Sequence, residues 1–244
     1  MTASLPSRER TWVADVTVPR YDVAAVVPVK TLALAKSRLN VSDDLRRALV
    51  LAFAVDTVTA LQANAYVSGV VVVTSDPDVE REMAALGVRL LRDDGTGLCP
   101  AVRAGGASAA SWWPSGGVLV VPADLPCLAA ADVTAVLSAG QRTDAALTAG
   151  QRTDGAFLPD RSGNGTTILL SAPARPVIPR YGPGSAIRHR ALGLRCLDDG
   201  PPGARLDIDT VADLQAASAL GLGPRTAAVV DGVRGLDARA KLAV

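Results

Sequence analysis

Aromatic residues, cysteine and histidine are all scarce in this chain of 244 residues, and each scarcity excludes something. Phe, Trp and Tyr make up 3% of the residues whereas 49% are hydrophobic, so a core must be built from Val, Leu, Ile and Ala. The three cysteines, Cys99, Cys127 and Cys196, lie far apart and form no C-x-x-C pair, which argues against a zinc site or a disulfide framework. With a single histidine, His189, no histidine cluster can hold a metal.

An excess of charge of either sign and a long apolar run are also missing. The 25 basic and 24 acidic side chains leave a formal charge of +1, which argues against a nucleic-acid binder with a broad electrostatic footprint. The first 20 residues contain no apolar core of a signal peptide, and no stretch approaches the ~20 apolar residues of a membrane span. We therefore expect a protein of the reducing cytoplasm.

Apolar runs alternate with helical periods along the first 140 residues. Strands are predicted at 22–28, 69–74, 88–91 and 117–121. Helices are predicted at 42–63, 100–111 and 130–138, and a further helix begins in the turn at 75–78 and ends at about residue 86. Ser42 is placed to cap the first helix, with two acidic residues in its first turn. This alternation predicts a single doubly wound, mostly parallel α/β domain of three layers.

After residue 139 the pattern becomes less regular. The hexapeptide AGQRTD occurs at 139–144 and again at 149–154, and we assign no function to the repetition. Further strands are predicted at 145–148, 168–170 and 206–210, and further helices around His189 and at 211–220. Thr210 and Asp213 have the spacing of a capping box for the last helix. The predicted organisation is a loose lead-in at 1–20, a domain at 21–221, and a tail at 222–244 without an assigned element.

A basic loop follows the first predicted strand, in the stretch VVPVKTLALAKSRL at 26–39. Its charged and hydroxyl side chains are Lys30, Lys36, Ser37 and Arg38. Loops at the ends of strands in α/β sheets commonly present charge to phosphorylated ligands. Because this loop has no glycine and no G-K-[ST] ending, it is not a Walker P-loop and would bind through side chains. The alternative is a solvated basic connection.

Three aspartates are candidates for a metal site. Asp124 follows a buried strand, and Asp207 and Asp209 alternate along a predicted strand, so their carboxylates share one face. Carboxylates suit a hard cation such as Mg²⁺, which is commonly held together with substrate phosphates. The alternatives are a turn role for Asp124 between two prolines, an ion pair of Asp207 with Arg205, and helix capping by Asp209.

A second group of residues suits an anion. Ser185 begins a helix after a Gly-Pro-Gly turn and would offer backbone N–H groups and a hydroxyl, and Thr167 follows a Gly-rich turn. An ordinary helix cap and a plain hairpin turn are the alternatives. We interpret His189 as a surface or packing residue rather than a catalytic base. No G-x-S-x-G elbow is present for a Ser-His-Asp set, whereas transfer between phosphates requires little acid–base chemistry from the protein.

Five motifs together resemble those of one enzyme family. They are V-P-V-K and A-K-S-R-L within 27–39, P-A-D-L-P at 122–126, G-N-G-T-T at 163–167, Y-G-P-G-S-x3-H at 181–189, and D-I-D-T at 207–210. Over roughly residues 22–220 the chain is similar to the 2-phospho-L-lactate or phosphoenolpyruvate guanylyltransferases of coenzyme F-420 biosynthesis. These are relatives of the molybdenum-cofactor guanylyltransferases, so the resemblance implies a GT-A-like, Rossmann-like nucleotidyltransferase fold.

The resemblance also implies roles for individual residues. The GTP phosphates would be held by Lys30, Lys36, Ser37 and Arg38, and the nucleotide-side loop would include Gly97 and Leu98. Mg²⁺ would be held by Asp124, Asp207 and Asp209. The acceptor carboxylate would be bound by Thr167, Gly182 and Ser185. Catalysis would depend on Lys30, Arg38 and Asp124. The family usually has Asn after the Gly-Leu pair, where this chain has Cys99.

The implied reaction moves GMP from GTP to the phosphate of a three-carbon acid and releases pyrophosphate. The Ala- and Arg-rich composition resembles actinobacterial proteins and favours phosphoenolpyruvate as the acceptor, with 2-phospho-L-lactate next. The implied partners are these small molecules rather than nucleic acid or a membrane; a homodimer and hand-over of an unstable product to the next enzyme are further hypotheses.

Two other functions stay open. One is a nucleotidyltransferase for a sugar phosphate or molybdopterin, although those enzymes share a G-x-S-x-R-x-G loop that is missing here. The other is a nucleotide-binding module without turnover.

Overall fold

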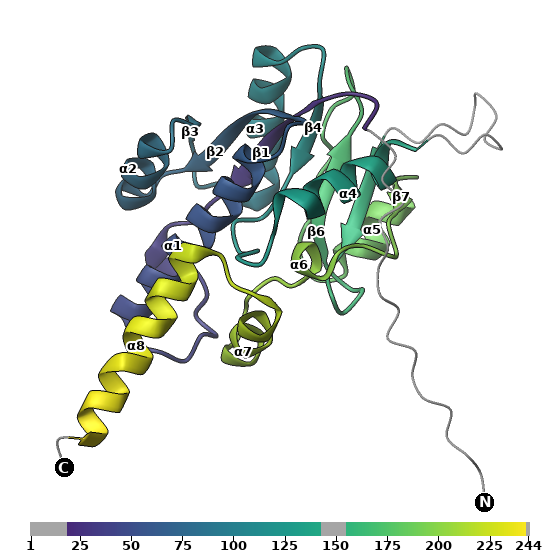
Figure 1. Cartoon of the computed structure of the whole chain (residues 1–244). Coiled ribbons are helices and arrows are strands. Elements are labelled where there is room, and N and C mark those ends of the chain that lie inside the picture. Colours follow the sequence, from purple (N-terminus) through teal and green to yellow (C-terminus); the bar gives the residue numbers. More distant parts are fainter. Residues whose placement is uncertain (1–18, 143–154, 243–244) are drawn as a thin grey trace, which may run out of the picture.

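One mixed sheet with helices on both faces organises the computed structural model, which describes residues 19–142 and 155–242 (Figure 1). Its strands are β1 Val23–Pro28, β2 Val67–Thr74, β3 Arg89–Arg92, β4 Gly117–Val120, β5 Gly155–Pro159, β6 Thr166–Ser171 and β7 Arg195–Cys196. They lie in the order β3-β2-β1-β4-β6-β5-β7. The strands β1, β2, β3 and β4 are mutually parallel, whereas β6 is antiparallel to β4 and β5. The predicted mostly parallel α/β class is confirmed.

Helices form the two outer layers. They are the 3-10 helix η1 Leu32–Leu34, α1 Asp43–Gln62, α2 Pro77–Ala85, α3 Leu98–Trp112, α4 Ala130–Gln141, α5 Ser185–Ala191, α6 Pro202–Arg205, α7 Val211–Leu220 and α8 Pro224–Leu242. Side chains of α1, α2 and α4 pack on one face of the sheet, and those of α3 and α5 pack on the other. Figure 1 shows α3 and α5 behind the sheet. No helix in the described ranges is long and apolar enough to cross a bilayer.

The central strand β1 contributes small aliphatic side chains to the core on both faces of the sheet. Val23, Ala25 and Val27 face the α1 layer, and Ala24 and Val26 face the α3 layer. Close packing here depends on glycine, because a Cβ added at Gly105 of α3 would lie 2.5 Å from Val26 Cγ1. The absence of a side chain lets α3 approach β1, which brings the start of α3 to the carboxyl edge of the sheet.

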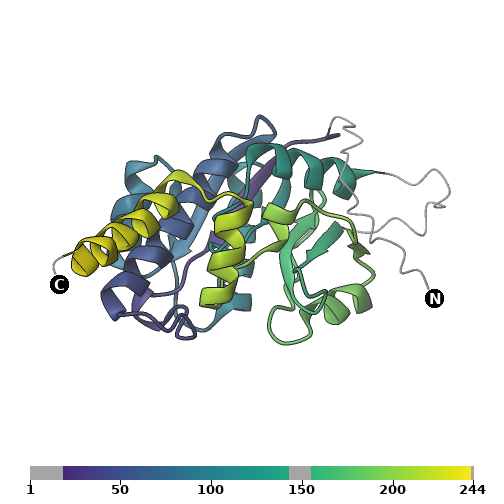
Figure 2. The same cartoon turned by 60° about the horizontal axis from the view of Figure 1, so that its bottom comes forward.

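The C-terminal segment, for which the sequence predicted no element, contains α8. Asp56 in α1 is buried, and its carboxylate accepts hydrogen bonds from the backbone N–H groups of Arg225 and Thr226 at 3.0 and 2.8 Å. A residue in α1 thus caps a helix that begins about 170 positions later. Both views show α8 beside α1 (Figures 1 and 2).

The prediction of a strand at 206–210 is wrong. The segment is irregular and joins α6 to α7, and Ile208 donates one backbone hydrogen bond, to the Asp124 carbonyl at 3.1 Å. The alternation of polar and apolar residues around the buried Ile208 does not require a partner strand. Any extended segment that buries one apolar side chain can show the same pattern. The strand predicted at 145–148 lies outside the described residues, and the sequence missed β5 and β7.

Candidate active site

The basic loop is held in place where β1 ends. Its first residue after the strand, Val29, donates from its backbone N–H to the Val73 carbonyl of β2. The backbone N–H of Leu32 then donates to the buried carboxylate of Asp76 at 2.8 Å. The other oxygen of Asp76 caps α2 by accepting from the N–H groups of Asp78 and Val79. One carboxylate therefore joins the loop to the start of a helix.

Arg46 supports the same loop from the other side. Its guanidinium donates to the carbonyls of Ala33 and Ala35 at 3.1 and 2.9 Å, and its side chain is 12% exposed. Sequence reasoning missed both Asp76 and Arg46 as supports. The S-D-P-D turn after β2 was a signal for Asp76 as a helix cap, whereas nothing in the sequence distinguishes Arg46 from a solvated helix residue.

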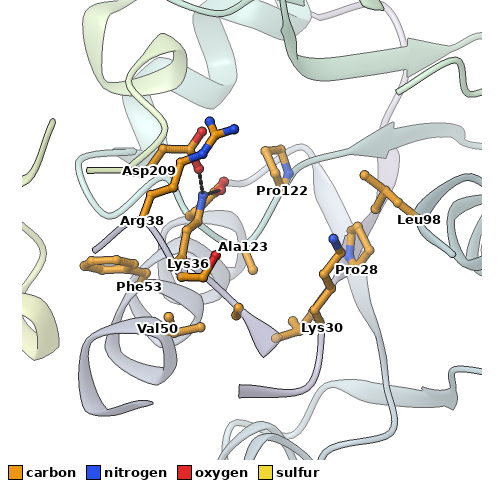
Figure 3. Close-up of a pocket in the computed structure, with 14 residues that line it drawn as sticks. Pro28, Lys30, Lys36, Arg38, Val50, Phe53, Leu98, Pro122, Ala123 and Asp209 are labelled. Carbon is orange, nitrogen blue, oxygen red and sulfur yellow. Dashed lines mark hydrogen bonds and ion pairs between the residues drawn. The ribbon is translucent and has the colours of Figure 1, made fainter. Parts of the chain in front are cut away.

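A cavity of about 350 Å³ opens beside the loop (Figure 3). Its lining includes all four side chains that the sequence assigned to phosphate: Lys30, Lys36, Ser37 and Arg38. Figure 3 shows Lys30 on one side of the cavity and Lys36 with Arg38 on the other. Pro122, Asp124 and Asp209 close the cavity away from the loop.

Lys36 reaches from the basic loop to the predicted metal ligands. Its ammonium donates to Asp124 Oδ2 and to Asp209 Oδ1, the latter at 2.5 Å. Burial alone would lower the pKa of Lys36, but the two carboxylates outweigh it and hold that pKa above its ordinary range. The backbone of Lys36 is left-handed, with φ +54°, which is unfavourable for a residue with a side chain.

The three aspartates do come together, although not on a strand. One ligand oxygen from each of Asp124, Asp207 and Asp209 lies within 4.8 Å of the others. Asp124 Oδ1 is buried and has no hydrogen-bond partner in the described part of the chain. Burial, together with the neighbouring charge of Asp124, raises the pKa of Asp207 to about 6. Lys36 is paired with two of these three carboxylates, those of Asp124 and Asp209.

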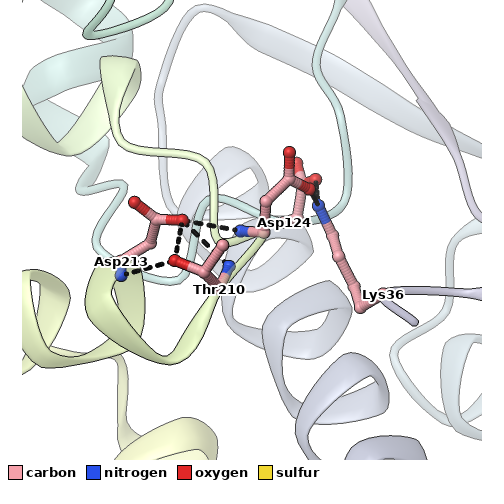
Figure 4. A network of polar contacts seen from close by, with 5 residues as sticks. Lys36, Asp124, Thr210 and Asp213 are labelled. Atoms are coloured by element: carbon pink, nitrogen blue, oxygen red, sulfur yellow. Dashed lines mark hydrogen bonds and ion pairs between the residues drawn. The ribbon is translucent and has the colours of Figure 1, made fainter. Parts of the chain in front are cut away.

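The structure places Asp124 in a turn, as its alternative held, but it contradicts the alternatives for Asp207 and Asp209. The guanidinium of Arg205 donates to the carbonyls of Pro159 and Asp160 instead of pairing with Asp207. The cap of α7 is the predicted box of Thr210 and Asp213, not Asp209 (Figure 4). In Figure 4 this box lies beside the Lys36–Asp124 ion pair. Asp213 also accepts from the backbone N–H of Asp209 at 3.3 Å, so the box helps to fix the backbone at Asp209.

A second cavity of about 340 Å³ lies on the other side of the carboxylates. It is lined by the three residues assigned to the acceptor, Thr167, Gly182 and Ser185. Asp160 and Tyr181, to which the sequence assigned no role, also line it, and the buried Tyr181 hydroxyl has no hydrogen-bond partner among the described residues. The wall shared by the two cavities consists of Pro28, Leu98, Pro122, Asp124 and Asp209.

Two details differ from the expected picture of ligand contacts. The backbone N–H groups of Ser185 and Ala186 donate to the carbonyls of Gly182 and Asn164, so both are already engaged within the protein. Gly97 precedes α3 with φ +118° and is not among the residues lining either cavity, whereas its neighbour Leu98 lines both. The Thr167 hydroxyl also donates within the protein, to the Leu158 carbonyl at 3.4 Å, so the Ser185 hydroxyl is the main candidate of this group for an anion contact in the second cavity.

Of the surface and packing roles that the sequence left open for His189, the structure shows the packing role. His189 is fully buried, and its Nε2 accepts a hydrogen bond from the backbone N–H of Arg180 at 2.9 Å. Nδ1 must then carry the proton and donate to Thr166 Oγ1 at 2.9 Å. Burial, with the nearby Arg188 and Arg180, lowers the pKa of His189 to about 4. With both nitrogens engaged, this ring has no free position for proton transfer to a substrate.

Comparisons with known proteins identify the family of the chain. The family model described as MobA-like NTP transferase domain matches residues 45–192. The phosphoenolpyruvate guanylyltransferase of Streptomyces avermitilis is 47% identical over 207 residues, which cover 83% of this chain and 91% of that protein. That of Salinispora arenicola is 45% identical over 205 residues, covering 83% and 90%. The chain belongs to the phosphoenolpyruvate guanylyltransferase family.

The fold of the chain is also similar to that of a solved structure. A crystal structure of a putative nucleotide-diphospho-sugar transferase from Desulfovibrio desulfuricans aligns with a TM-score of 0.63 at 17% identity. The alignment covers 88% of this chain and 96% of that one, which supports the GT-A-like fold. The matched family model leaves out the basic loop, Asp207 and Asp209, so the meeting of these residues at Asp124 is known from the structure of this chain.

Proposed function

We propose that the protein transfers GMP from GTP to the phosphate of phosphoenolpyruvate and releases pyrophosphate. The observation that carries this proposal is the wall of carboxylates between a basic cavity and a hydroxyl-lined cavity. Two phosphorylated substrates could meet at such a wall from opposite sides. The names of the relatives, at 40–47% identity in the first seven, supply the nucleotide and the acceptor.

The basic cavity is the proposed nucleotide side. Lys30 and Arg38 are exposed cations at its mouth and would attract and hold the triphosphate. Ser37 would add a hydroxyl donor, and Leu98, on the shared wall, would border the nucleotide next to Gly97. A volume of about 350 Å³ is within the range of small-molecule sites.

The carboxylate wall fits a divalent cation. Its donors are three hard oxygen ligands, the Lys36 ammonium is a cation that already bridges two of them, and Asp124 Oδ1 has no partner in the described chain. We propose that Asp124, Asp207 and Asp209 hold Mg²⁺. When bound there, Mg²⁺ would neutralise phosphate charge next to the reacting groups.

The second cavity is the proposed acceptor side. Thr167 and Ser185 line it, and Gly182, with φ +112°, lets the backbone turn without a side chain in the way. These residues would bind the carboxylate of the three-carbon acid, which would leave its phosphate directed to the shared wall.

Chemistry at the wall requires little acid–base help from the chain. An oxygen of the acceptor phosphate forms a bond to the α-phosphorus of GTP, and the bond from that phosphorus to the β,γ-pyrophosphate breaks. The attacking phosphate is already anionic, which agrees with the engagement of both His189 nitrogens inside the protein. Lys30 and Arg38 would stabilise the negative charge that accumulates on the leaving group.

Other acceptors are less favoured than phosphoenolpyruvate. The nearest is 2-phospho-L-lactate, which has the same carboxylate and phosphate on a tetrahedral carbon. A sugar phosphate or molybdopterin acceptor, or a binding module without turnover, agrees less well with the named relatives. The cysteines Cys99, Cys127 and Cys196 are free thiols, which fits the cytoplasmic location that we propose.

Pyrophosphate release from GTP, Mg²⁺ and each acceptor tests the proposal, with mass spectrometry of the product. We expect phosphoenolpyruvate to give the highest rate and a guanosine diphosphate-linked three-carbon acid as the product. Asp124→Ala should lose turnover by a factor of about 100 or more while it still binds GTP, because one metal ligand is missing. Absence of turnover with every acceptor would contradict the proposed enzymatic activity. Unchanged turnover of Asp124→Ala would contradict the proposed metal site at the carboxylates.

A further inference from the structure

Lys36 lines the first cavity, as Lys30 does, but its ammonium is bound to two carboxylates. Its ammonium lies between Asp124 Oδ2 and Asp209 Oδ1, and its side chain is only 14% exposed. Lys30, on the opposite side of the cavity, is exposed. The resemblance to the family implied a phosphate contact for both lysines, and the structure separates them.

The position of Lys36 is determined by the surrounding structure. Asp76 and Arg46 hold the loop before it, and its own carbonyl accepts a hydrogen bond from the Leu39 N–H at 2.9 Å. Within this frame Lys36 adopts its left-handed conformation, which costs free energy in a residue with a Cβ. Strain that the surroundings maintain at one residue is typical of functional positions.

The ammonium is bound to two of the three carboxylates that a divalent cation would need. Asp124 and Asp209 belong to the cluster of three carboxylates whose oxygens lie within 4.8 Å of one another. An ammonium paired with both carboxylates and a metal ion bound by the same carboxylates carry like charges at close range, so each disfavours the other. The flexible four-carbon stem of lysine lets the ammonium leave without movement of the backbone.

We propose that Lys36 and the divalent cation are alternative partners of Asp124 and Asp209, so that entry of the cation releases Lys36 to the phosphates of the nucleotide. This inference rests on the proposed function and adds an order to it. Before the cation binds, Lys36 partly neutralises the carboxylates; after it binds, the basic cavity gains one cation. Metal binding and triphosphate binding therefore favour each other, and the coupling passes through one side chain.

Lysine labelling on the wild-type protein tests the release directly. The protein, without nucleotide, is treated briefly with an acylating reagent in metal-free buffer and in Mn²⁺, and labelled lysines are quantified by mass spectrometry. We expect Mn²⁺ to increase labelling of Lys36 at least about threefold, because the ammonium loses its two carboxylate partners. Lys30 serves as the internal control and should change little. Equal or lower labelling of Lys36 in Mn²⁺ would overturn the proposal.

Metal affinity provides a second test that needs no turnover. Titration with Mn²⁺ followed by electron paramagnetic resonance, without nucleotide, should show Lys36→Met binding Mn²⁺ on the order of tenfold more tightly than wild type, since the competing charge is gone. Lys30→Met is the matched control, with an affinity close to that of wild type. Inorganic triphosphate with Mn²⁺ should bind Lys36→Met more weakly than wild type.

These experiments test the competition between Lys36 and the cation independently of the proposed acceptor. Mn²⁺ affinity of Lys36→Met equal to or below that of wild type would overturn the competition, as would unchanged triphosphate binding. If Lys36→Met does not fold, the labelling experiment on wild type decides alone. Failure of wild type to use phosphoenolpyruvate would remove the proposed acceptor but would leave labelling and Mn²⁺ binding as valid tests of Lys36.

Discussion

Lys30, Lys36 and Arg38 are three cations of one loop with different surroundings. Lys36 is paired with carboxylates, whereas Lys30 and Arg38 are exposed and line the mouth of the first cavity. An exposed cation with a free stem can meet a phosphate at little desolvation cost, so the proposed GTP contacts depend mostly on Lys30 and Arg38.

Replacing either exposed cation should affect one substrate more than the other. We expect Lys30→Ala and Arg38→Ala to raise the KM for GTP about tenfold or more, as for the loss of a hydrogen bond between charged groups, with a much smaller change in the KM for the acceptor. The measurement is pyrophosphate release with each substrate varied at saturating levels of the other. Equal losses for both substrates would count against the assignment of this loop to GTP.

At the scale of elements, capping interactions join segments that are distant in the sequence. Ser42 caps α1 and Thr210 caps α7, as the sequence predicted from local patterns. Asp56 acts over a longer distance, because its carboxylate accepts from the start of α8. Gly223 permits this approach, since a Cβ there would lie 2.4 Å from the Asp56 carboxyl carbon.

Loss of the Asp56 carboxylate should loosen α8. Asp56→Ala leaves the N–H groups of Arg225 and Thr226 without their acceptor, so we expect a loss of about 1–3 kcal/mol in the free energy of unfolding. Urea unfolding measures the loss, and hydrogen exchange should be faster in the first turns of α8. Asp44→Ala, an exposed acid on the same helix, is the control. A midpoint equal to that of the control would show that α8 does not depend on this cap.

For the whole molecule, the free energy of unfolding should depend on the protonation of His189, which is buried between α5 and the sheet. His189 contacts Phe157 of the sheet and Tyr181, with ring centroids 5.7 and 5.5 Å away. Its pKa of about 4 is below the ~6.5 of an unfolded histidine, so the unfolded chain binds the proton more tightly. The contribution of neutral His189 is complete above about pH 6.5 and is lost as the pH falls toward 4.

This predicts a pH dependence that a variant should remove. Between about pH 6.5 and 4 the contribution of His189 should fall by about 1.4 kcal/mol per pH unit. Urea unfolding at about pH 7, 6 and 5 should show the difference between wild type and His189→Gln shrinking as the pH falls. Other titrating groups, including Asp207, are common to both proteins and cancel. A constant difference would contradict neutral burial of His189.

Local patterns in the sequence were sufficient for most elements and for the chemical character of the site. Apolar runs placed the strands β1 to β4, and capping residues placed the starts of α1 and α7, because both depend on neighbours within a few positions. The charges of the basic loop and the aspartates predicted phosphate and a cation for the same reason: side-chain chemistry does not depend on the fold.

Tertiary structure alone decided how these groups meet. The segment with Asp207 and Asp209 is irregular, and it reaches Asp124 through a backbone hydrogen bond from Ile208 that no local pattern announces. The same holds for Asp76 and Arg46 behind the loop, and for Lys36, which lies on the carboxylates rather than free in the cavity. Such contacts join residues tens of positions apart, and their energies depend on burial and distance that exist only once the chain has folded.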